Sequence, residues 1–139
     1  MPAKSANIVP RCRAMLVCDQ VIVERDTEKY SIIGSFTEVT VSSASPNLGA
    51  FSVFLLLTEG TGENSITMQL HDLKNDEVVF ETVPVTMTFE SRLDLLAIVV
   101  RWPSIEVVTD GAFDVVAYAN GDEIERQSFV VHIEAEEES

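Results

Sequence analysis

Apolar and polar residues alternate along most of this chain, in short runs with a period of two residues. Residues 65–72 show the pattern clearly, because Ile66, Met68 and Leu70 share one parity and polar side chains occupy the other. Such alternation is typical of a half-buried β-strand. No stretch of twelve residues carries a helical stripe with caps. The pattern therefore predicts an all-β protein.

Clusters of glycine, asparagine, aspartate, serine and proline separate the runs and delimit the expected strands. Those strands lie at residues 13–24, 30–41, 51–58, 65–72, 77–89, 94–102 with a short extension at 105–108, 112–119 and 123–133. Residues 51–58 are apolar at both parities, which predicts a central strand covered on both faces. Short strands with frequent turns predict an antiparallel immunoglobulin-like β-sandwich of about eight strands.

Turn chemistry predicts two hairpins and one irregular strand. Asn120-Gly121 joins the last two strands, because both residues tolerate positive φ. A five-residue polar loop, 25–29, joins the first two strands, and centring it on Thr27 pairs residues whose numbers sum to 54. That register sets Cys18 opposite Phe36. Pro84 cannot donate to a ladder, so its strand is expected to be an edge or to be bulged there.

The inward side chains of the strand that contains Pro84 are expected to be Val83, Val85, Met87 and Phe89. Val78 and Phe80 have the opposite parity. Two explanations stay open for them: a bulge in the strand, or apolar surface that a second copy covers.

Length and composition predict one globular domain, at residues 10–133, with a flexible arm at 1–9 and an acidic disordered tail at 134–139. The net charge is −14, from 9 Lys and Arg against 23 Asp and Glu. A negative net charge of this size argues against binding to nucleic acid phosphates or anionic lipids. The bases concentrate early, with five bases and four acids in residues 1–30.

Neither end of the chain predicts a membrane or export segment. No apolar core of a signal peptide follows Met1, and no apolar run approaches the ~18–20 residues that span a bilayer. A cytoplasmic location is therefore expected. Cys12 and Cys18 lie roughly 20 Å apart on an extended strand at ~3.3 Å per residue, whereas a disulfide needs about 7 Å. We expect two small buried side chains, neither a disulfide nor a zinc site.

The sequence offers little for catalysis. His71 lies on the polar face of its strand and His132 near the end of the last strand, and neither lies in a local signature with serine or cysteine. We therefore expect a protein that is not an enzyme, with no catalytic residue, cofactor or metal assigned. The alternative is a small hydrolase whose triad is assembled from distant residues.

Asp19 interrupts an apolar run, and two interpretations stay open. It is either a buried carboxylate with a raised pKa, which would mark a site, or an acceptor of hydrogen bonds from Ser35, Thr37 or amides at a bulge. Gly34, within the second strand, indicates a bulge or a close backbone approach.

Acidic residues gather in the expected turns, which leaves a second alternative, a Ca²⁺-binding or small-ligand sandwich. They are Asp26 and Glu28; Glu59 and Glu63; Asp72, Asp76 and Glu77; Asp122 and Glu123. None of these turns has the spaced ligand set of a calcium loop. Trp102, the sole tryptophan, shares parity with Leu96, Ile98 and Val100, so it is expected to pack against the opposing sheet.

Two stretches together resemble a known family. They are residues 13–23 continuing into 30–36, and residues 110–115 with Asn120-Gly121-Asp122-Glu123. The chain resembles an uncharacterised bacterial family of small single-domain immunoglobulin-like β-sandwich proteins, a domain of unknown function. The resemblance implies the fold and supplies no activity, cofactor or catalytic residue. The function expected from all these features is a non-enzymatic protein-interaction or structural module that pairs with a protein partner or a second copy as a homodimer.

Overall fold

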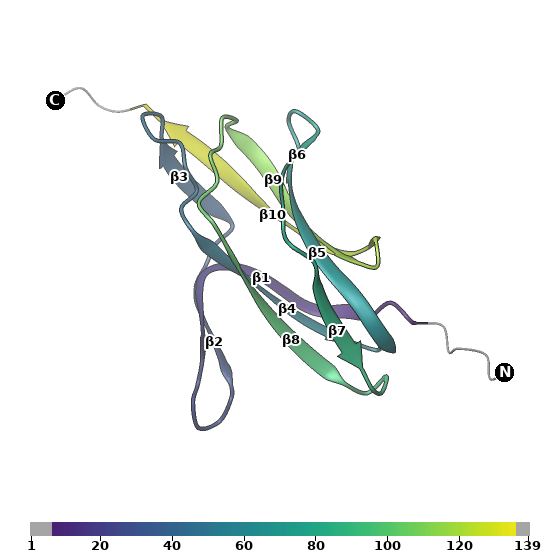
Figure 1. The fold of residues 1–139 in the computed structure, drawn as a ribbon. Helices are drawn as coiled ribbons and strands as arrows, with labels where there is room; N and C mark the ends of the chain where they lie inside the picture. The colour runs from purple at the N-terminus through teal and green to yellow at the C-terminus, as the bar shows by residue number, and fades with distance from the viewer. Residues whose placement is uncertain (1–6, 136–139) are drawn as a thin grey trace.

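Ten strands form two stacked sheets in the computed structural model, which describes residues 7–135 (Figure 1). The strands are β1 (Arg11–Val23), β2 (Tyr30–Ser35), β3 (Glu38–Ser42), β4 (Phe51–Thr58), β5 (Gly62–Asp72), β6 (Glu77–Glu81), β7 (Val85–Phe89), β8 (Leu95–Trp102), β9 (Gly111–Ala119) and β10 (Asp122–Glu134). Sheet 1 has the order β2-β1-β4-β8, and sheet 2 has the order β3-β10-β9-β5-β6, with β7 also on β5. The expected all-β sandwich is confirmed, with ten strands where about eight were expected.

The two additional strands arise because two expected strands are interrupted. The run 30–41 divides into β2 in sheet 1 and β3 in sheet 2, where β3 pairs in parallel with β10. The run 77–89 divides into β6 and β7, which both pair with one edge of β5. At the break, the Met68 amide donates to Thr82 Oγ1 at 2.9 Å. The expected edge position of Pro84 is confirmed.

The break also changes which side chains point inward. Val83 is 82% exposed and Val85 is 39% exposed, so the inward positions expected for both are wrong, whereas Phe89 is buried as expected. Phe80 packs against the core. The interrupted strand thus accounts for the mixed parity of this segment. The expected extension at 105–108 is not a strand, because Ile105 and Val107 instead exchange backbone hydrogen bonds with the loop at residues 46–48.

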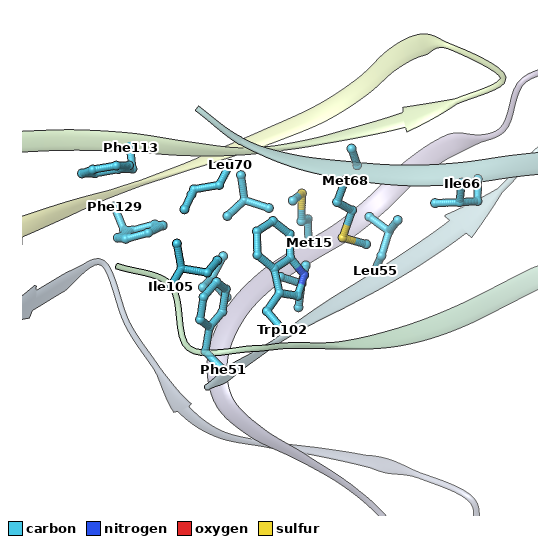
Figure 2. Close-up of a cluster of buried hydrophobic side chains, with 14 of the residues drawn as sticks. Met15, Phe51, Leu55, Ile66, Met68, Leu70, Trp102, Ile105, Phe113 and Phe129 are labelled. Carbon is cyan, nitrogen blue, oxygen red and sulfur yellow. The ribbon is translucent and has the colours of Figure 1, made fainter. Parts of the chain in front are cut away.

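The core lies between the sheets, where the inward parities of both sheets meet (Figure 2). Trp102 packs between Phe51 and Phe80, with ring centroids 5.1 and 5.2 Å away, so the expected contact with the opposing sheet is confirmed. β4 is buried along most of both faces and lies between β1 and β8, as its doubly apolar pattern predicted. Within the described residues, Trp102 Nε1 is a buried polar atom that lacks a hydrogen-bond partner.

The register of the first hairpin differs from the expected one by a single residue. Cys18 pairs with Ser35 and Val21 with Ile32, so the paired numbers sum to 53 rather than 54. The reason is the loop, in which Glu28 adopts φ 57° and the Glu24 amide donates to the Lys29 carbonyl. The turn therefore contains four residues instead of five, and the expected register is wrong.

Residues near both ends join the sandwich. The Ile8 amide donates to Thr61 Oγ1 at 3.0 Å, and the Asn7 side-chain amide donates to the Glu63 carbonyl at 2.7 Å. Residues 7–9, expected in the arm, are thus attached to the start of β5. Glu134, expected in the tail, is the last residue of β10. The remaining parts of the expected arm and tail, residues 1–6 and 136–139, lie outside the described residues.

Candidate functional site

The outer face of sheet 1 is apolar. On β4, Phe54 and Leu56 alternate with core residues and therefore point away from sheet 2. Beside Phe54 stand Leu16 of β1, 37% exposed, and Val99 of β8, 38% exposed. Phe54 itself is only 8% exposed, because the ring of Tyr30 lies 5.1 Å from it. This face therefore has a small hydrophobic cluster of its own, outside the core between the sheets.

The residue that covers Phe54 comes from a projecting hairpin. β1 bends sharply in Figure 1, and its second half projects with β2 as a hairpin arm, residues 19–34. Arg101 attaches the arm to the sheet, because its Nη1 donates to the Asp19 carbonyl at 2.5 Å and to Ser52 Oγ at 3.0 Å. An open hollow of about 680 Å³ lies between the arm and strands β4 and β8. The hollow is open to solvent, and Val21 and Val99 are the larger apolar side chains that line it.

Asp19 is exposed at the base of this arm, so the hypothesis of a buried carboxylate is wrong. The shifted register also removes the expected pairing of Asp19 with Ser35. Asp19 instead lies against Gly34, where an added Cβ would be 2.3 Å from Asp19 Oδ2. Gly34 has φ 69°, so the close backbone approach expected at this glycine is confirmed.

The outer face of sheet 2 is covered by a polar network. Asp114 on β9 is only 4% exposed, and it accepts hydrogen bonds from Arg126 Nη1, at 2.8 Å, and from the Ser128 hydroxyl. Arg126 also forms an ion pair with Glu123. The hydrogen bonds that Arg126 donates to Glu123 and to Asp114 raise the pKa of Arg126, and the one to Glu123 lowers the pKa of Glu123. The buried carboxylate is thus fully partnered, as a buried charge requires.

The histidines do not form a nucleophile–base pair within the described residues. His71 Nε2 lies 2.8 Å from Gln69 Oε1 and 3.4 Å from the Tyr118 hydroxyl. Ser128 is close in the sheet, but its hydroxyl donates to Asp114 and not to His71. A serine nucleophile needs a base within hydrogen-bonding reach, and this arrangement lacks that contact. His132 is half exposed and lies 3.9 Å from Glu38.

Both cysteines are free thiols, Cys18 buried and Cys12 half-buried. Burial raises the pKa of both, and for Cys12 the negative charge of Glu125 contributes, so that its pKa is about 11. Since the thiolate is the nucleophile and the metal-binding form, both side chains are poorly suited to that chemistry at neutral pH. Cys18 is a small buried side chain, as expected, whereas Cys12 is only half-buried where it packs against the core.

Three of the acidic turn residues, Asp72, Glu59 and Glu123, have structural partners. Asp72 accepts hydrogen bonds from the amides of Lys74 and Asn75 and so closes the β5–β6 turn. Burial alone raises the pKa of Asp72, but hydrogen bonds, among them one from Thr109, outweigh it and hold the pKa below its ordinary value. Glu59 pairs with Arg11 at 2.9 Å. Among residues 7–135, no group of three or more His, Cys, Asp or Glu side chains could hold a metal ion.

Two features of the surface were missed by the sequence reasoning. One is the exposed edge of β8, which pairs only with β4. The other is a cluster of arginines, Arg11, Arg13 and Arg92, around a hollow of about 420 Å³. The excess of bases in residues 1–30 was a partial signal for the cluster. Arg92 could not be added to it, because only the fold brings the turn before β8 to the end of sheet 1 where β1 begins.

The geometry defines a two-sheet β-sandwich. Its distinctive features are the apolar outer face of sheet 1, the arginine cluster and the unpaired edge of β8. The chain belongs to a family of unknown function, DUF6941, which matches residues 13–132. The expected resemblance to an uncharacterised family is therefore confirmed.

Structural comparison found a similar solved structure, an immunoglobulin-like protein from Pseudomonas aeruginosa. It shares 16% sequence identity with this chain, over 94% of this chain and 99% of that one, with a TM-score of 0.41. A likeness at this level carries no argument about function. A search of curated proteins found no match. No helix able to cross a membrane occurs among the described residues.

Proposed function

We propose that this protein is a non-enzymatic interaction module that pairs with a second copy of itself through the edge of β8. The observation that carries the proposal is the composition of this edge. β8 is eight residues long and contains no proline, glycine or acidic residue, and Arg101 is its one charged residue. A long apolar edge strand exposes unpaired backbone groups and invites pairing with another chain.

The other sheet edges carry features that oppose such pairing. The β6–β7 edge is interrupted at residues 82–84 by a segment that contains Pro84. β3 has five residues and begins with Glu38, and β2 has six and contains Gly34 at φ 69°. Short strands, charge, proline and irregular backbone are the devices that protect an edge. β8 is longer than these edges, contains no proline and no irregular backbone, and carries one charged residue, Arg101, near its end, which favours it over the other edges.

A second copy fits this edge because an antiparallel pair of identical strands can form about a two-fold axis. Each β8 would then present the same backbone groups to its partner, and two four-stranded sheets would join into one. Val99 and Leu95, 38% and 48% exposed, stand beside the edge on the apolar outer face. Their burial across the axis adds hydrophobic stabilisation to the backbone pairing. No catalytic step or cofactor enters the proposal.

The test is the oligomeric state of the full chain at high salt, which screens contacts between exposed charges, measured by light scattering coupled to size exclusion over a wide range of concentrations. We expect the parent to be a dimer and Val99→Lys to be a monomer, because two lysines would meet near the axis. Val78→Lys is the matched control, since Val78 is 50% exposed but lies on the interrupted edge. The control should remain dimeric.

Two results would contradict the proposal: a parent that is monomeric at the highest concentration, or a Val99→Lys variant that dimerises like the parent. Far-ultraviolet circular dichroism shows whether each variant keeps its β-structure. If Val99→Lys unfolds, Ala97→Lys is tested in its place, because Ala97 and Val99 are two residues apart on β8 and point to the same outer face.

A further inference from the structure

Three arginines converge at the end of sheet 1 where β1 begins. They surround a hollow of about 420 Å³, here called the arginine hollow, which is lined by Arg11, Arg13, Thr58, Glu59, Arg92 and Leu93. The chain has only nine Lys and Arg residues and a net charge of −14. A third of its basic residues therefore gather at one place, on a protein that is acidic almost everywhere else.

The backbone builds this cluster in two ways. The β1–β4 register shifts between Cys12 and Ala14, which leaves Arg13 as an extra residue without a partner on β4. A β-bulge of this kind redirects a side chain. The turn that carries Arg92 is held close by, because the Glu59 amide donates to the Arg92 carbonyl at 3.2 Å. The three arginines are thus positioned by ordered backbone and not by a shared strand face alone.

The hollow keeps an excess of positive charge. Arg11 Nε pairs with Glu59 at 2.9 Å, but among residues 7–135 the guanidinium groups of Arg13 and Arg92 form no ion pair. Glu90 and Asp94 lie on the same turn as Arg92. The Asp94 carboxylate, however, accepts hydrogen bonds from the amides of Glu90 and Ser91. Among the residues that line the hollow, three cations stand against one acid, and the carboxylates of Glu90 and Asp94 stay charged on the adjacent turn.

We propose that the arginine hollow binds the acidic segment of residues 134–138 from a second copy of the chain. This segment contains four glutamates and one alanine. Arginine is the residue best suited to bind carboxylates, because its planar guanidinium can donate two parallel hydrogen bonds to them. Leu93, 91% exposed beside the hollow, offers an apolar contact for the alanine.

The same copy cannot supply this segment. β1 begins near one end of the molecule and β10 runs to the opposite end (Figure 1). Arg11 is the first residue of β1, and Glu134 is the last residue of β10. β10 has 13 residues, so at ~3.3 Å per residue the first and last residues of this strand are about 40 Å apart. Residues 135–138 reach about 14 Å when fully extended. The contact must therefore join two molecules head to tail.

This contact is independent of the pairing through β8, and the two have different signatures. A head-to-tail contact between unlike surfaces closes into a ring or extends into an open chain, whereas the β8 contact pairs one surface with a copy of itself. It is also electrostatic, and its strength falls as salt is added, because the screening length for exposed charges shortens from about 10 Å at 0.1 M to about 3 Å at 1 M. An apolar β8 interface is far less sensitive to salt. The head-to-tail contact can thus be measured in the Val99→Lys background, in which the β8 interface is absent.

The experiment is sedimentation velocity of two further variants in that background, at low and at high salt. One variant, Arg13→Glu with Arg92→Glu, has no functional hollow. The other replaces Glu134, Glu136, Glu137 and Glu138 by Gln and has no acidic segment. We expect the background protein to associate at low salt and to dissociate at high salt, and we expect each variant alone to lose this association. A mixture of the two should form a 1:1 complex, because one supplies the hollow and the other the segment.

Arg25→Glu is the matched control, because Arg25 lies in the loop of the hairpin arm and not in the hollow. This control should associate like the background protein. The proposal is overturned if the background protein shows no salt-sensitive association, if either variant alone associates as before, or if the mixture forms no complex. Each of these outcomes leaves the β8 dimer of the parent chain unaffected, so the two proposals fail separately.

Discussion

The outer faces of the two sheets are built on the same alternating strands, yet different side chains stand on them. On sheet 1, Phe54 is buried under Tyr30 from the hairpin arm, and Leu16 and Val99 stay partly exposed around it. On sheet 2, Asp114 is buried among the Arg126 guanidinium and the Ser128 hydroxyl. One face is stabilised by apolar packing and the other by charge and hydrogen bonds.

This difference bears on which face can receive a partner. Polar groups on sheet 2 already satisfy one another, so a partner would have to replace existing hydrogen bonds at a cost in desolvation. Exposed apolar groups on sheet 1 have no such internal partners, and their burial by a second chain is favourable. The free edge of β8 borders the apolar face. The comparison therefore favours sheet 1 as the interaction surface.

The largest expected effect comes from removing the buried aromatic ring on sheet 1. Phe54→Ala should lower the free energy of unfolding by about 3 kcal/mol, because the change deletes a buried ring and leaves a cavity under Tyr30. Leu16→Ala, on the same face but 37% exposed, should cost about 1 kcal/mol. Urea unfolding of the two variants measures the difference. Equal losses would mean that the arm does not cover Phe54 in solution.

A smaller effect is expected at the base of the arm. Gly34→Ala should cost about 1–2 kcal/mol, because Gly34 has φ 69° and its new Cβ would meet the Asp19 carboxylate. Gly49→Ala is the control, since Gly49 has φ 74° but no atom within 4 Å of an added Cβ. The excess loss at Gly34 over Gly49 isolates the contact. Adding Asp19→Ala should remove that excess, and an unchanged excess would contradict the close approach.

The smallest effect concerns the polar face and its dependence on pH. The hydrogen bond from Arg126 lowers the pKa of Glu123, so the folded state favours the charged carboxylate. Its contribution to stability is complete above the ordinary value of 4.5 and is lost as the pH falls through the lowered pKa. Glu123→Gln should therefore destabilise the protein at neutral pH and have little effect in acid. Urea unfolding across the acid range measures this.

Glu63→Gln is the control for that measurement, because Glu63 forms no ion pair among the described residues. Its effect on stability should be small at every pH. Added salt should also reduce the effect of Glu123→Gln, since the pair is partly exposed. A Glu123→Gln effect that persists in acid would mean that the loss comes from packing and not from charge.

Local sequence patterns were sufficient to predict the strands and much of the core. Residues 51–58 form a central strand as predicted, because apolar side chains at both parities can be buried only between neighbouring strands and two covering layers. Pro84 interrupts an edge as predicted, because a residue without an amide hydrogen cannot join a ladder on both sides. These outcomes follow from the chemistry of single residues and their immediate neighbours, which the sequence states directly.

The candidate surfaces were less accessible from sequence. The hairpin register depended on the positive φ of Glu28, which nothing in the side chain demands, and the one-residue shift moved Asp19 from Ser35 to Gly34. The exposure of Val83 depended on where the strand broke. The hairpin register and the position of the strand break depend on small energy differences between alternative backbone conformations. Packing against residues far away in the sequence determines which conformation is adopted.

The all-β class, the approximate positions of the strands and the acidic character of the chain follow from the amino-acid sequence, because each depends on composition or on residues that are neighbours along the chain. Which strand edge is left unpaired, which outer face is apolar, and that Arg92 joins Arg11 and Arg13 around one hollow became known from the folded arrangement of the strands. These properties depend on contacts between residues far apart in sequence, and a period of two carries no information about which strands become neighbours.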